Sequence, residues 1–458
     1  MIRKLLIANR GEIALRILRA CHELGIGSVV AYSDVDRDSL PVRLSDEAVC
    51  IGPGPASRSY NNIPAIISAA LVTGCDAIHP GYGFLAENSS LAEICEECNL
   101  IFVGPRPEVL SQSGNKSVAR QIMKKAKIPI TPGSEDPVLD VQAARSIARE
   151  IGFPVLIKAV AGGGGRGMRV AWDERELMQV FPVAQSEAQA AFGNGAVYVE
   201  RYLDRPRHVE VQILADGHGH VVALGERDCS LQRRYQKLIE ESPAPNISSK
   251  LRDGLQKSAV RAAKALEYTG AGTFEFLVDR EEHFYFAEVN ARIQVEHPVT
   301  ECVTGYDLIK WQLKVASGEQ LDFGQKDVRL RGHAIEARIN AENVAADFAP
   351  SCGQIEDLVL PGGPGVRVDT HLYTGYVVPP HYDSLLAKLI VWGSDRDEAI
   401  NRLHRALSET MISGVHTTVD FYKLLIRDSA FVNGQVHTGL VGEFISRSRE
   451  NSVLVPTE

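Results

Sequence analysis

The sequence predicts a protein of mixed α/β and α+β architecture with several domains. Three observations lead to this prediction: strands and helices alternate near the N-terminus, a run of glycines joins two strands in the middle, and strands connected by tight turns follow. The chain has 458 residues, which is enough for roughly two to four domains of about 100–200 residues each.

The N-terminal region has the strand–helix–strand pattern of a Rossmann-like, parallel α/β domain. Leu5–Ala8 and Ser28–Tyr32 are apolar, strand-like runs, and Gly11–Leu24 between them carries apolar residues at helical spacing. Ile101–Val103 is a later strand of the same region. The first turn, Asn9–Glu12, lacks the G-x-G-x-x-G pattern, so dinucleotide binding is not supported.

Composition and charge exclude several classes of protein. The net charge of −9 argues against a nucleic-acid-binding protein, which usually carries a basic excess or stripe. No apolar run approaches the ~20 residues that span a bilayer, Ala65–Val72 being typical of the longest, and Met1 leads directly into a strand. Cys95 and Cys98 form a CxxC without a second pair, which predicts a structural role rather than a zinc site. The expected compartment is reducing, either the cytoplasm or an organelle interior.

A glycine-rich loop between two strands is the first sign of chemistry. The strand Pro154–Lys158 is followed by the loop Gly162–Gly167 and then by the strand-like Met168–Val170. Glycine N–H groups can wrap phosphate oxygens because no Cβ blocks a close approach, whereas a structural turn would not need four consecutive glycines. A Rossmann site requires a helix after such a loop, so the pattern favours a phosphate-binding hairpin lid.

Two other phosphate-binding signatures are rejected. Leu156–Lys158 and Asp322–Gly324 mimic protein-kinase motifs, but in kinases the glycine loop precedes the lysine, and this chain has no HRD tripeptide. Gly114–Ser117 lacks the Gly-Lys-Ser/Thr order of a P-loop. The glycine run therefore indicates a different class of nucleotide site.

The segment Glu288–Pro298 is the most informative stretch of the chain. As a strand, it would place Glu, Asn, Arg, Gln and Glu on one face and apolar residues on the other, until His297 and Pro298 end it. An exposed strand face usually carries Thr, Lys or Ser. This set of metal ligands, anion binders and a base therefore indicates a functional face.

A predicted hairpin adds a second carboxylate to that face. A tight turn near 279–282 would place Glu275 opposite residue 286 or 288, and both registers put it on the same face as Glu288. Together with Asn290 these side chains form an all-oxygen ligand set, which suits Mg²⁺ or Mn²⁺ rather than zinc. Two bare carboxylates would repel each other, which also favours a bound cation.

Several motifs distributed over nearly the whole chain are specific when they are taken together. Besides the glycine loop, they are Ile7–Ala14, His79–Leu85, Glu226–Arg234, Arg292–Glu301, Gly332–Asn340 and Tyr382–Leu385. With this set the chain resembles the biotin carboxylases, and its central region resembles the ATP-grasp superfamily. The resemblance implies a Rossmann-like N-terminal domain at 1–113, an ATP-grasp domain at 114–318 with a mobile lid at about 132–203, and a mixed α+β C-terminal domain at 330–447.

The resemblance implies that ATP binds between two antiparallel sheets. Its phosphates would be held by Lys116, Lys158 and the amides of Gly164 and Gly165. Relatives often carry His at the position of Tyr235, and because a Tyr hydroxyl can still hydrogen-bond there, we expect ATP binding with altered affinity. The metal at Glu275, Glu288 and Asn290 would neutralise charge during phosphoryl transfer. The remaining predicted nucleotide contacts are Glu200, Arg201, Tyr202, Leu203 and His208.

The resemblance also implies catalytic roles. Bicarbonate would lie on Lys237, Arg292 and the backbone of Val295, and Glu296 would take its proton as general base. The carboxyphosphate formed in this way would decompose to CO₂ and phosphate, and the phosphate would deprotonate the ureido nitrogen of biotin.

Biotin would contact Arg338, which stabilises the resulting enolate, and Tyr82. The chain has no Met-Lys-Met tripeptide, so we expect biotin to arrive on a separate biotin carboxyl carrier protein. The resemblance further implies carboxyltransferase subunits, a homodimer, no nucleic-acid or membrane partner, and function in the cytoplasm or in an organelle such as the plastid stroma.

The final acceptor of the carboxyl group stays open. Acetyl-CoA carboxylase in fatty acid synthesis is the expected assignment, but pyruvate, 2-oxoglutarate and other acyl-CoA carboxylases share this first half-reaction. A biotin-independent ATP-grasp ligase is an alternative against which Arg338 and the region after Gly332 argue. A non-catalytic nucleotide sensor would be marked by loss of Glu275, Glu288, Arg292 or Glu296, and all four are present.

Overall fold

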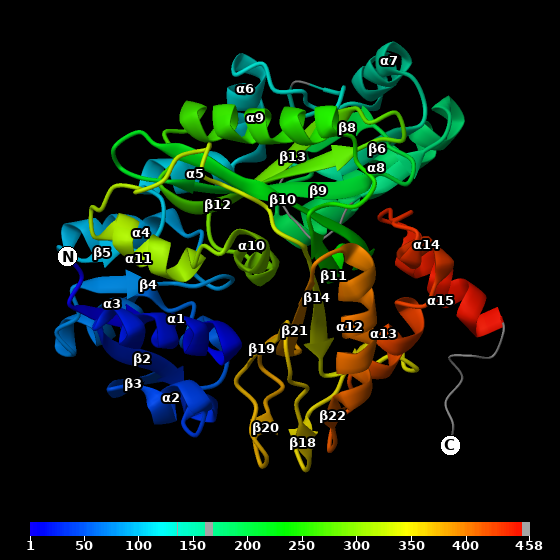
Figure 1. Cartoon of the computed structure of the whole chain (residues 1–458). Helices are drawn as coiled ribbons and strands as arrows, with labels where there is room; N and C mark the ends of the chain where they lie inside the picture. The colour runs from blue at the N-terminus through cyan, green and yellow to red at the C-terminus, as the bar shows by residue number, and fades with distance from the viewer. Residues whose placement is uncertain (135, 161–167, 451–458) are drawn as a thin grey trace.

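The structure, a computed structural model, describes residues 1–134, 136–160 and 168–450, and its N-terminal region is a five-stranded parallel sheet in the order β3-β2-β1-β4-β5 (Figure 1). Alternate residues of β1 enter different cores: Leu5 packs with the α1 side and Leu6 with the α3 side. This arrangement confirms the predicted Rossmann-like region. Its elements are β1 (Lys4–Ile7), α1 (Gly11–Leu24), β2 (Gly27–Ser33), η1 (Asp34–Asp36), α2 (Leu40–Leu44), β3 (Glu47–Gly52), η2 (Ala56–Arg58), α3 (Ile63–Val72), β4 (Ala77–His79), α4 (Ser89–Glu97), β5 (Ile101–Phe102) and α5 (Pro107–Gly114).

A separate three-stranded antiparallel sheet, in the order β7-β6-β8, forms the part predicted as the lid. A strand follows the glycine run, as predicted, and pairs back on the strand before it. The glycine run itself, including Gly164 and Gly165, lies outside the described residues. The elements here are α6 (Lys116–Lys125), α7 (Val141–Ile151), β6 (Val155–Ala159), β7 (Arg169–Ala171), α8 (Glu174–Phe192) and β8 (Val197–Arg201).

An eight-stranded antiparallel sheet in the order β13-β12-β9-β10-β11-β14-β21-β19 is the central feature of the molecule. It crosses the predicted boundary between the central and C-terminal domains, because β11 pairs with β14. Figure 1 shows this sheet running from the green upper part into the orange lower part. Its central elements are β9 (Arg207–Ala215), β10 (Val221–Arg233), β11 (Gln236–Ser242), α9 (Ser249–Ala265), β12 (Gly270–Val278), β13 (Phe284–Asn290), α10 (His297–Thr304), α11 (Leu308–Ala316) and β14 (His333–Asn340).

The C-terminal region completes this sheet and covers one of its faces. Leu403 and neighbouring apolar residues of α12 share a core with Ile335 of β14 and Leu389 of β21. Within the described residues, no helix is both long and apolar enough to cross a bilayer. The elements are β15 (Glu342–Asn343), β16 (Ala349–Pro350), β17 (Gly353–Gln354), β18 (Leu358–Val359), β19 (Val366–Thr370), β20 (Val377–Val378), β21 (Leu385–Gly393), α12 (Arg396–Glu409), β22 (Met411–Ile412), α13 (Val419–Leu425), α14 (Ser429–Val432) and α15 (Leu440–Glu450).

The predicted continuous strand from Glu288 to His297 is wrong. The strand β13 ends at Asn290, residues 291–296 form a loop, and α10 begins at His297 with Pro298 in its first turn. Proline suits the first turn of a helix because its fixed φ is already helical and its missing N–H would have no partner there. Pro298 therefore opens a helix instead of merely stopping a strand.

Candidate active site

The candidate site is built around Lys237, a side chain that three carboxylates from three different parts of the fold surround. Its Nζ donates to Glu210 Oε2 at 2.6 Å, Glu296 Oε1 at 2.7 Å and Glu275 Oε1 at 2.9 Å. Glu210 lies on β9, Glu275 on β12, and Glu296 immediately precedes α10. Lys237 itself lies on β11. The eight-stranded sheet thus brings together residues that are far apart in the sequence.

The charges in this cluster fix each other's protonation states. Burial acts to raise the pKa of Glu275, but Lys237 and His208 hold it well below its usual range. Burial likewise opposes ionisation of Glu296, and the charges of Lys237 and Arg338 outweigh it and hold the pKa of Glu296 well below its usual range. Burial acts to lower the pKa of Lys237, and the three carboxylates raise it well above its ordinary value. Both acids are therefore ionised and Lys237 is charged at neutral pH.

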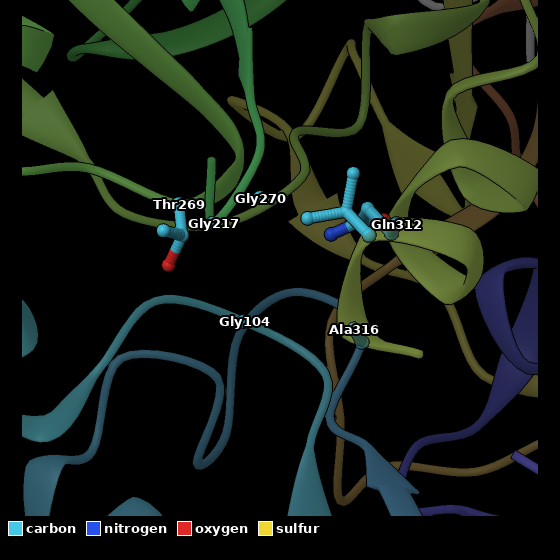
Figure 2. Close-up of a pocket in the computed structure, with 7 residues that line it drawn as sticks. Gly104, Gly217, Thr269, Gly270, Gln312 and Ala316 are labelled. Atoms are coloured by element: carbon cyan, nitrogen blue, oxygen red, sulfur yellow. The ribbon is translucent and has the colours of Figure 1, made fainter. Parts of the chain in front are cut away.

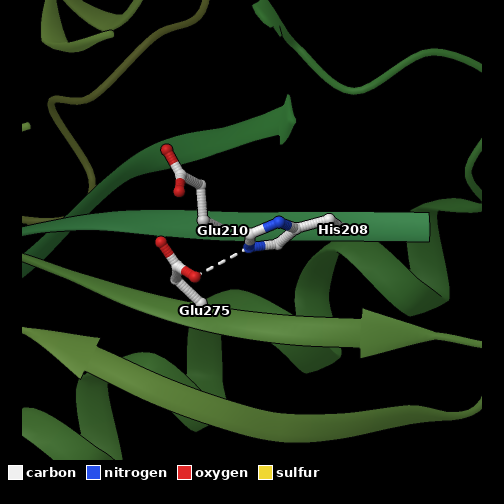
Figure 3. Close-up of side chains that lie close together, drawn as sticks. All are labelled: His208, Glu210 and Glu275. Carbon is white, nitrogen blue, oxygen red and sulfur yellow. Dashed lines mark hydrogen bonds and ion pairs between the residues drawn. The ribbon is translucent and has the colours of Figure 1, made fainter. Parts of the chain in front are cut away.

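Strand register places glutamates opposite each other twice around Glu275. Glu275 faces Glu210 across the β9–β12 ladder and Glu288 across the β12–β13 ladder. The predicted common face of Glu275 and Glu288 is therefore confirmed, and of the two predicted registers the structure has the one with residue 288 opposite Glu275. His208 Nε2 lies 2.8 Å from the second oxygen of Glu275. Figure 3 shows His208 and Glu210 on one strand, with the His208 ring reaching Glu275 on the neighbouring strand.

Arg338 extends the cluster onto the C-terminal part of the sheet. Its Nη2 donates to Glu296 Oε2 at 2.9 Å, and its Nε donates to Glu240 Oε1 at 2.6 Å. Glu296 therefore accepts from a lysine on one oxygen and from an arginine on the other. Burial and the neighbouring Glu296 raise the pKa of Glu240 to about 7, although Arg338 acts the other way.

Arg292 lies at the rim of the cluster. Its Nε donates to Glu87 at 3.0 Å, and its Nη2 donates to Asn290 Oδ1 at 2.9 Å. Asn290 in turn donates to Glu275 Oε1 at 2.8 Å, so Arg292 reaches the cluster through the amide. Gln294 donates to the same oxygen of Glu275 at 2.9 Å. The loop after β13 thus delivers its polar side chains to one place although it is not a strand.

Tyr82 and Val295 are connected by one buried ion pair. The Tyr82 hydroxyl donates to Glu12, and Lys388 Nζ lies 3.0 Å from the same carboxylate. Lys388 also donates to the Val295 carbonyl at 3.0 Å. These contacts join the N-terminal helix α1, the loop before α10 and strand β21 next to Val295 and Tyr82, which are predicted to contact bicarbonate and biotin.

A second group of cationic side chains lies between the lid and the central sheet. Lys158 Nζ and Arg120 Nη1 each lie 2.6 Å from an oxygen of Glu200. Burial lowers the pKa of Lys116 while the charges of Glu288 and Glu200 act the other way, which places Lys116 near both. The charge of Lys158 also acts on Lys116, so the two predicted phosphate ligands lie within electrostatic range of each other, and Lys116 lies within that range of Glu288.

The remaining predicted nucleotide contacts surround the end of β8. Tyr202 packs edge-on against Trp172, and Leu203 is half-buried beside it. Arg201 is exposed and donates to the Ile151 carbonyl at 3.1 Å. Tyr235 is 59% exposed and has a positive φ of 67° in the β10–β11 turn, so its side chain is not held by packing.

Sequence reasoning missed Glu210, Arg227 and Glu240. Arg227 is fully buried and donates to five side chains, which are Glu210, Gln212, Thr273, Gln294 and Thr300. These hydrogen bonds connect the polar face of β9 and β12 to Gln294 in the loop after β13 and to Thr300 in α10. The alternation of His208, Glu210 and Gln212 along β9 was a usable signal for Glu210, because it repeats the pattern of a polar strand face.

Two features of the described residues lie beside or outside this site. Cys229 is a buried thiol, and burial raises its pKa well above the usual value. A cavity of about 160 Å³ lies at the other end of β9 and β12, between α11 and the turns that contain Gly217 and Gly270 (Figure 2). The cavity is therefore separate from the cluster around Lys237.

Comparisons with known proteins cover the whole length of the chain. Family models match it in three consecutive parts: biotin carboxylase, N-terminal domain, at 1–110; carbamoyl-phosphate synthase L chain, ATP binding domain, at 115–323; and biotin carboxylase C-terminal domain at 336–443. The biotin carboxylase of Nostoc sp. is 56% identical over 440 residues, which cover 96% of this chain and 98% of that one. One of the pyruvate carboxylase subunits of Methanothermobacter thermautotrophicus is 53% identical over 444 residues, which cover 97% of this chain and 90% of that one.

A solved structure shows the same extent of similarity. The biotin carboxylase domain dimer of Hydrogenobacter thermophilus 2-oxoglutarate carboxylase, in complex with magnesium ADP, ADP and bicarbonate, matches with a TM-score of 0.94 at 45% identity, covering 100% of both chains.

Proposed function

Because the chain belongs to the biotin carboxylase family, we propose that it uses ATP and bicarbonate to carboxylate biotin that is carried on a separate protein. The observation that carries this proposal is the position of Glu296 between Lys237 and Arg338, with one carboxylate oxygen on each cation. The arrangement combines a proton acceptor with two cations that can bind anionic oxygens.

The nucleotide would bind between the lid and the eight-stranded sheet. Lys116 and Lys158 would hold its phosphates together with the amides of Gly164 and Gly165. Glu200 pairs with Lys158 and would orient that lysine. The adenine and ribose would contact the end of β8 and the β10–β11 turn through Arg201, Tyr202, Leu203, His208 and Tyr235.

Glu275, Glu288 and Asn290 fit a magnesium or manganese ion. The first two stand directly opposite each other, and all three offer hard oxygen ligands. The proximity of two carboxylates is unfavourable without a positive charge between them. A bound ion would supply charge neutralisation for the phosphates.

Bicarbonate would take Lys237, Arg292 and the Val295 backbone as its partners. Its negative charge would compete with Glu296 for Lys237, and the loss of a cationic partner raises the proton affinity of a carboxylate. Glu296 can then accept the bicarbonate proton as general base while the bicarbonate oxygen attacks the γ-phosphoryl group. The resulting carboxyphosphate would release CO₂ and phosphate, and the phosphate would take the ureido proton of biotin.

Arg338 would stabilise the negative oxygen of the biotin enolate. It can do so because it is held at the edge of the cluster by Glu240 and Glu296 and lies near Tyr82. Tyr82, fixed by Glu12, would orient the ureido group. The cations of the site therefore serve two substrates in sequence.

Acetyl-CoA carboxylase is the assembly that we propose for this subunit, with a biotin carboxyl carrier protein and carboxyltransferase subunits as partners and the cytoplasm or plastid stroma as its compartment. Chloroplastic biotin carboxylases among the relatives support this proposal. Pyruvate and 2-oxoglutarate carboxylases are the alternatives, supported by the relatives of those names. A homodimer is supported by the dimeric Hydrogenobacter structure.

Formation of ADP by the purified chain tests the proposal. Magnesium ATP, labelled bicarbonate and free biotin should give ADP and labelled carboxybiotin, and Glu296→Gln should abolish both. A matched control is Glu267→Gln, because Glu267 makes an ion pair with Arg106 on the surface and should not change turnover. ATP cleavage indifferent to biotin would instead indicate an amine-activating ligase, and ATP binding without cleavage would indicate a sensor.

A further inference from the structure

Glu336 is a fully buried carboxylate for which the proposed reaction has no use. It lies on β14, directly opposite Glu240 of the neighbouring strand β11. Neither of its oxygens accepts a hydrogen bond from any described donor, and the second oxygen of Glu240 equally accepts none. Two opposed residues in a ladder have Cβ atoms about 4.5–5.5 Å apart, so two glutamate side chains can reach each other.

The ion pairs around Glu336 are already balanced without it. The linked cations are Arg227, Lys237, Arg338 and protonated His208, and the linked anions are Glu210, Glu275, Glu296 and Glu240. Burial acts to lower the pKa of His208, but Glu275 outweighs it and raises that pKa above its usual value. An ionised Glu336 would add a further negative charge to a set that is neutral among the described residues. A buried charge without a partner is strongly unfavourable.

The groups that face Glu336 from each neighbouring element do not supply a partner. They are Glu240 from β11, Lys388 from β21, Arg338 from its own strand, Glu296 from the loop before α10 and Cys302 from α10. Lys388, the nearest additional cation, is engaged by Glu12 and the Val295 carbonyl. Burial raises the pKa of Glu336 well above its usual value, and Glu240 and Glu296 add to the rise that Lys388 and Arg338 oppose.

We propose that Glu336 is a positioning residue for Arg338: it stands protonated and donates a hydrogen bond to the unused oxygen of Glu240. The proton removes one of the three carboxylate charges around Arg338, so the guanidinium faces two negative charges instead of three and attracts the oxygen of the biotin enolate more strongly. The hydrogen bond also fixes Glu240, which holds Arg338 in place. The catalytic part of this proposal rests on the proposed biotin carboxylation, whereas the protonation state does not.

Infrared difference spectroscopy of the full chain tests the protonation state directly. The wild type at about pH 8, above the pKa of about 7 of Glu240, should show the carbonyl stretch of a buried carboxylic acid, and Glu336→Gln should lose it. Glu241→Gln is the matched control: this neighbouring residue is also buried but is paired with His333 and Arg396, so the acid band should stay. Absence of the band in the wild type, or its survival in Glu336→Gln, would overturn the proposal.

Thermal unfolding as a function of pH gives a second test that needs no activity. A carboxyl whose folded pKa is raised destabilises the fold as the pH rises from its unfolded pKa through its folded pKa. The midpoint of Glu336→Gln should therefore exceed that of the wild type by a margin that grows as the pH rises above about 4.5. An equal or lower midpoint across this range, including a failure of Glu336→Gln to fold, would contradict the proposal.

Kinetics then test the link to Arg338. The value of kcat/KM for biotin should decline at alkaline pH in the wild type, and this decline should be absent in Glu336→Gln. Glu336→Ala removes the hydrogen-bond donor, so it should lower kcat/KM for biotin by roughly tenfold with the KM for ATP unchanged. Equal losses for biotin and ATP would show a general structural role. A wild type that does not carboxylate biotin would refute the proposed function, while the spectroscopic and unfolding results would still decide the protonation of Glu336.

Discussion

The β12–β13 and β11–β14 ladders each place two glutamates directly opposite one another, but their surroundings differ. Glu288 of the first pair is exposed and has Lys116 nearby, whereas both members of the second pair, Glu240 and Glu336, are fully buried. An open pair can take a metal ion from solvent and exchange it, whereas a pair sealed from solvent can be relieved by a proton. The same cross-strand repulsion is thus relieved in two ways within one sheet.

A third opposed pair, Glu210 and Glu275, is relieved by Lys237. This lysine donates to both carboxylates and to Glu296. The three pairs lead to different predictions for mutants. Removal of Lys237, a cation that belongs to the protein, should strongly reduce activity and stability, whereas removal of the metal ligand Glu288 should change only the dependence on metal. Removal of Glu336, an excess carboxylate, should leave the stability nearly unchanged or increase it.

Lys237→Met should have the largest effect. It leaves three buried carboxylates without their shared cation, so we expect loss of biotin-dependent ADP formation and a decrease of about 3–5 kcal/mol in the free energy of unfolding. Urea denaturation measures the latter. Lys257→Met is the control, because Lys257 makes an exposed ion pair with Asp253 and its loss should cost less than about 1 kcal/mol. A stable Lys237→Met protein would show that the carboxylates are not charged.

Glu288→Gln should affect the metal rather than the fold. We expect the magnesium concentration for half-maximal ADP formation to rise by at least about 10–100-fold, because a loss of that size is typical even of a residue that only supports a metal ligand. The unfolding midpoint without metal should not fall, because the repulsion with Glu275 is removed. Removal of the metal with a chelator should lower the midpoint of the wild type but not that of the variant. Unchanged magnesium dependence would place the ion elsewhere.

Glu296→Gln should show an acid dependence opposite to that of Glu336→Gln. The folded pKa of Glu296 is depressed, so its contribution is complete above the unfolded pKa of about 4.3 and is lost as the pH falls through the folded pKa. At pH 7 the free energy of unfolding of the variant should be lower by about 1.5–3 kcal/mol, which is the typical contribution of a hydrogen bond to a charged group. Denaturant titrations from pH 7 to pH 3 should show this gap closing on the acid side, and a gap independent of pH would argue against an ionised Glu296.

Tyr235→Phe should have the smallest effect, because this residue lies apart from all three pairs and is exposed. Loss of one neutral hydrogen bond of about 0.5–1.5 kcal/mol corresponds to a rise of roughly two- to tenfold in the KM for ATP. The KM for biotin should not change. A larger rise would mean that the tyrosine ring itself packs on the nucleotide.

Local patterns in the sequence predict most of the elements that carry the site. The boundaries of α1 agree with Gly11–Leu24 because its apolar spacing is regular. The hairpin pattern correctly places Glu275 and Glu288 on one face, but the register shift between Glu275 and Phe276 that sets the two glutamates directly opposite each other has no signal in the pattern. The polar residues of the loop at 291–296 alternate as they would in a strand, which is why the pattern predicts one there. Their direction comes instead from partners on other elements: Gln294 is held by Arg227, and Glu296 is held by Lys237 and Arg338, which no local pattern connects to this loop.

The pairing of distant strands lies beyond such patterns. Glu240 and Glu336 are 96 positions apart in the chain and meet only because β11 pairs with β14. The sequence around Glu240 does not indicate that β14 is its neighbour, and the sequence around Glu336 does not indicate β11, because strands of many different sequences can pair at the same place in a sheet. The protonated acid that we infer could therefore not be predicted without the sheet.

The continuity of the eight-stranded sheet limits how this protein can be divided into fragments. A fragment that ends before Gly332 would leave β11 as an open edge, with a row of unpaired backbone groups and with Leu238 and Ile239 stripped of the core they share with Leu403. Such an edge recruits strands from other molecules and promotes aggregation. The lid has its own three-stranded sheet and its own apolar core, so it is the better candidate for excision or transplantation as a unit.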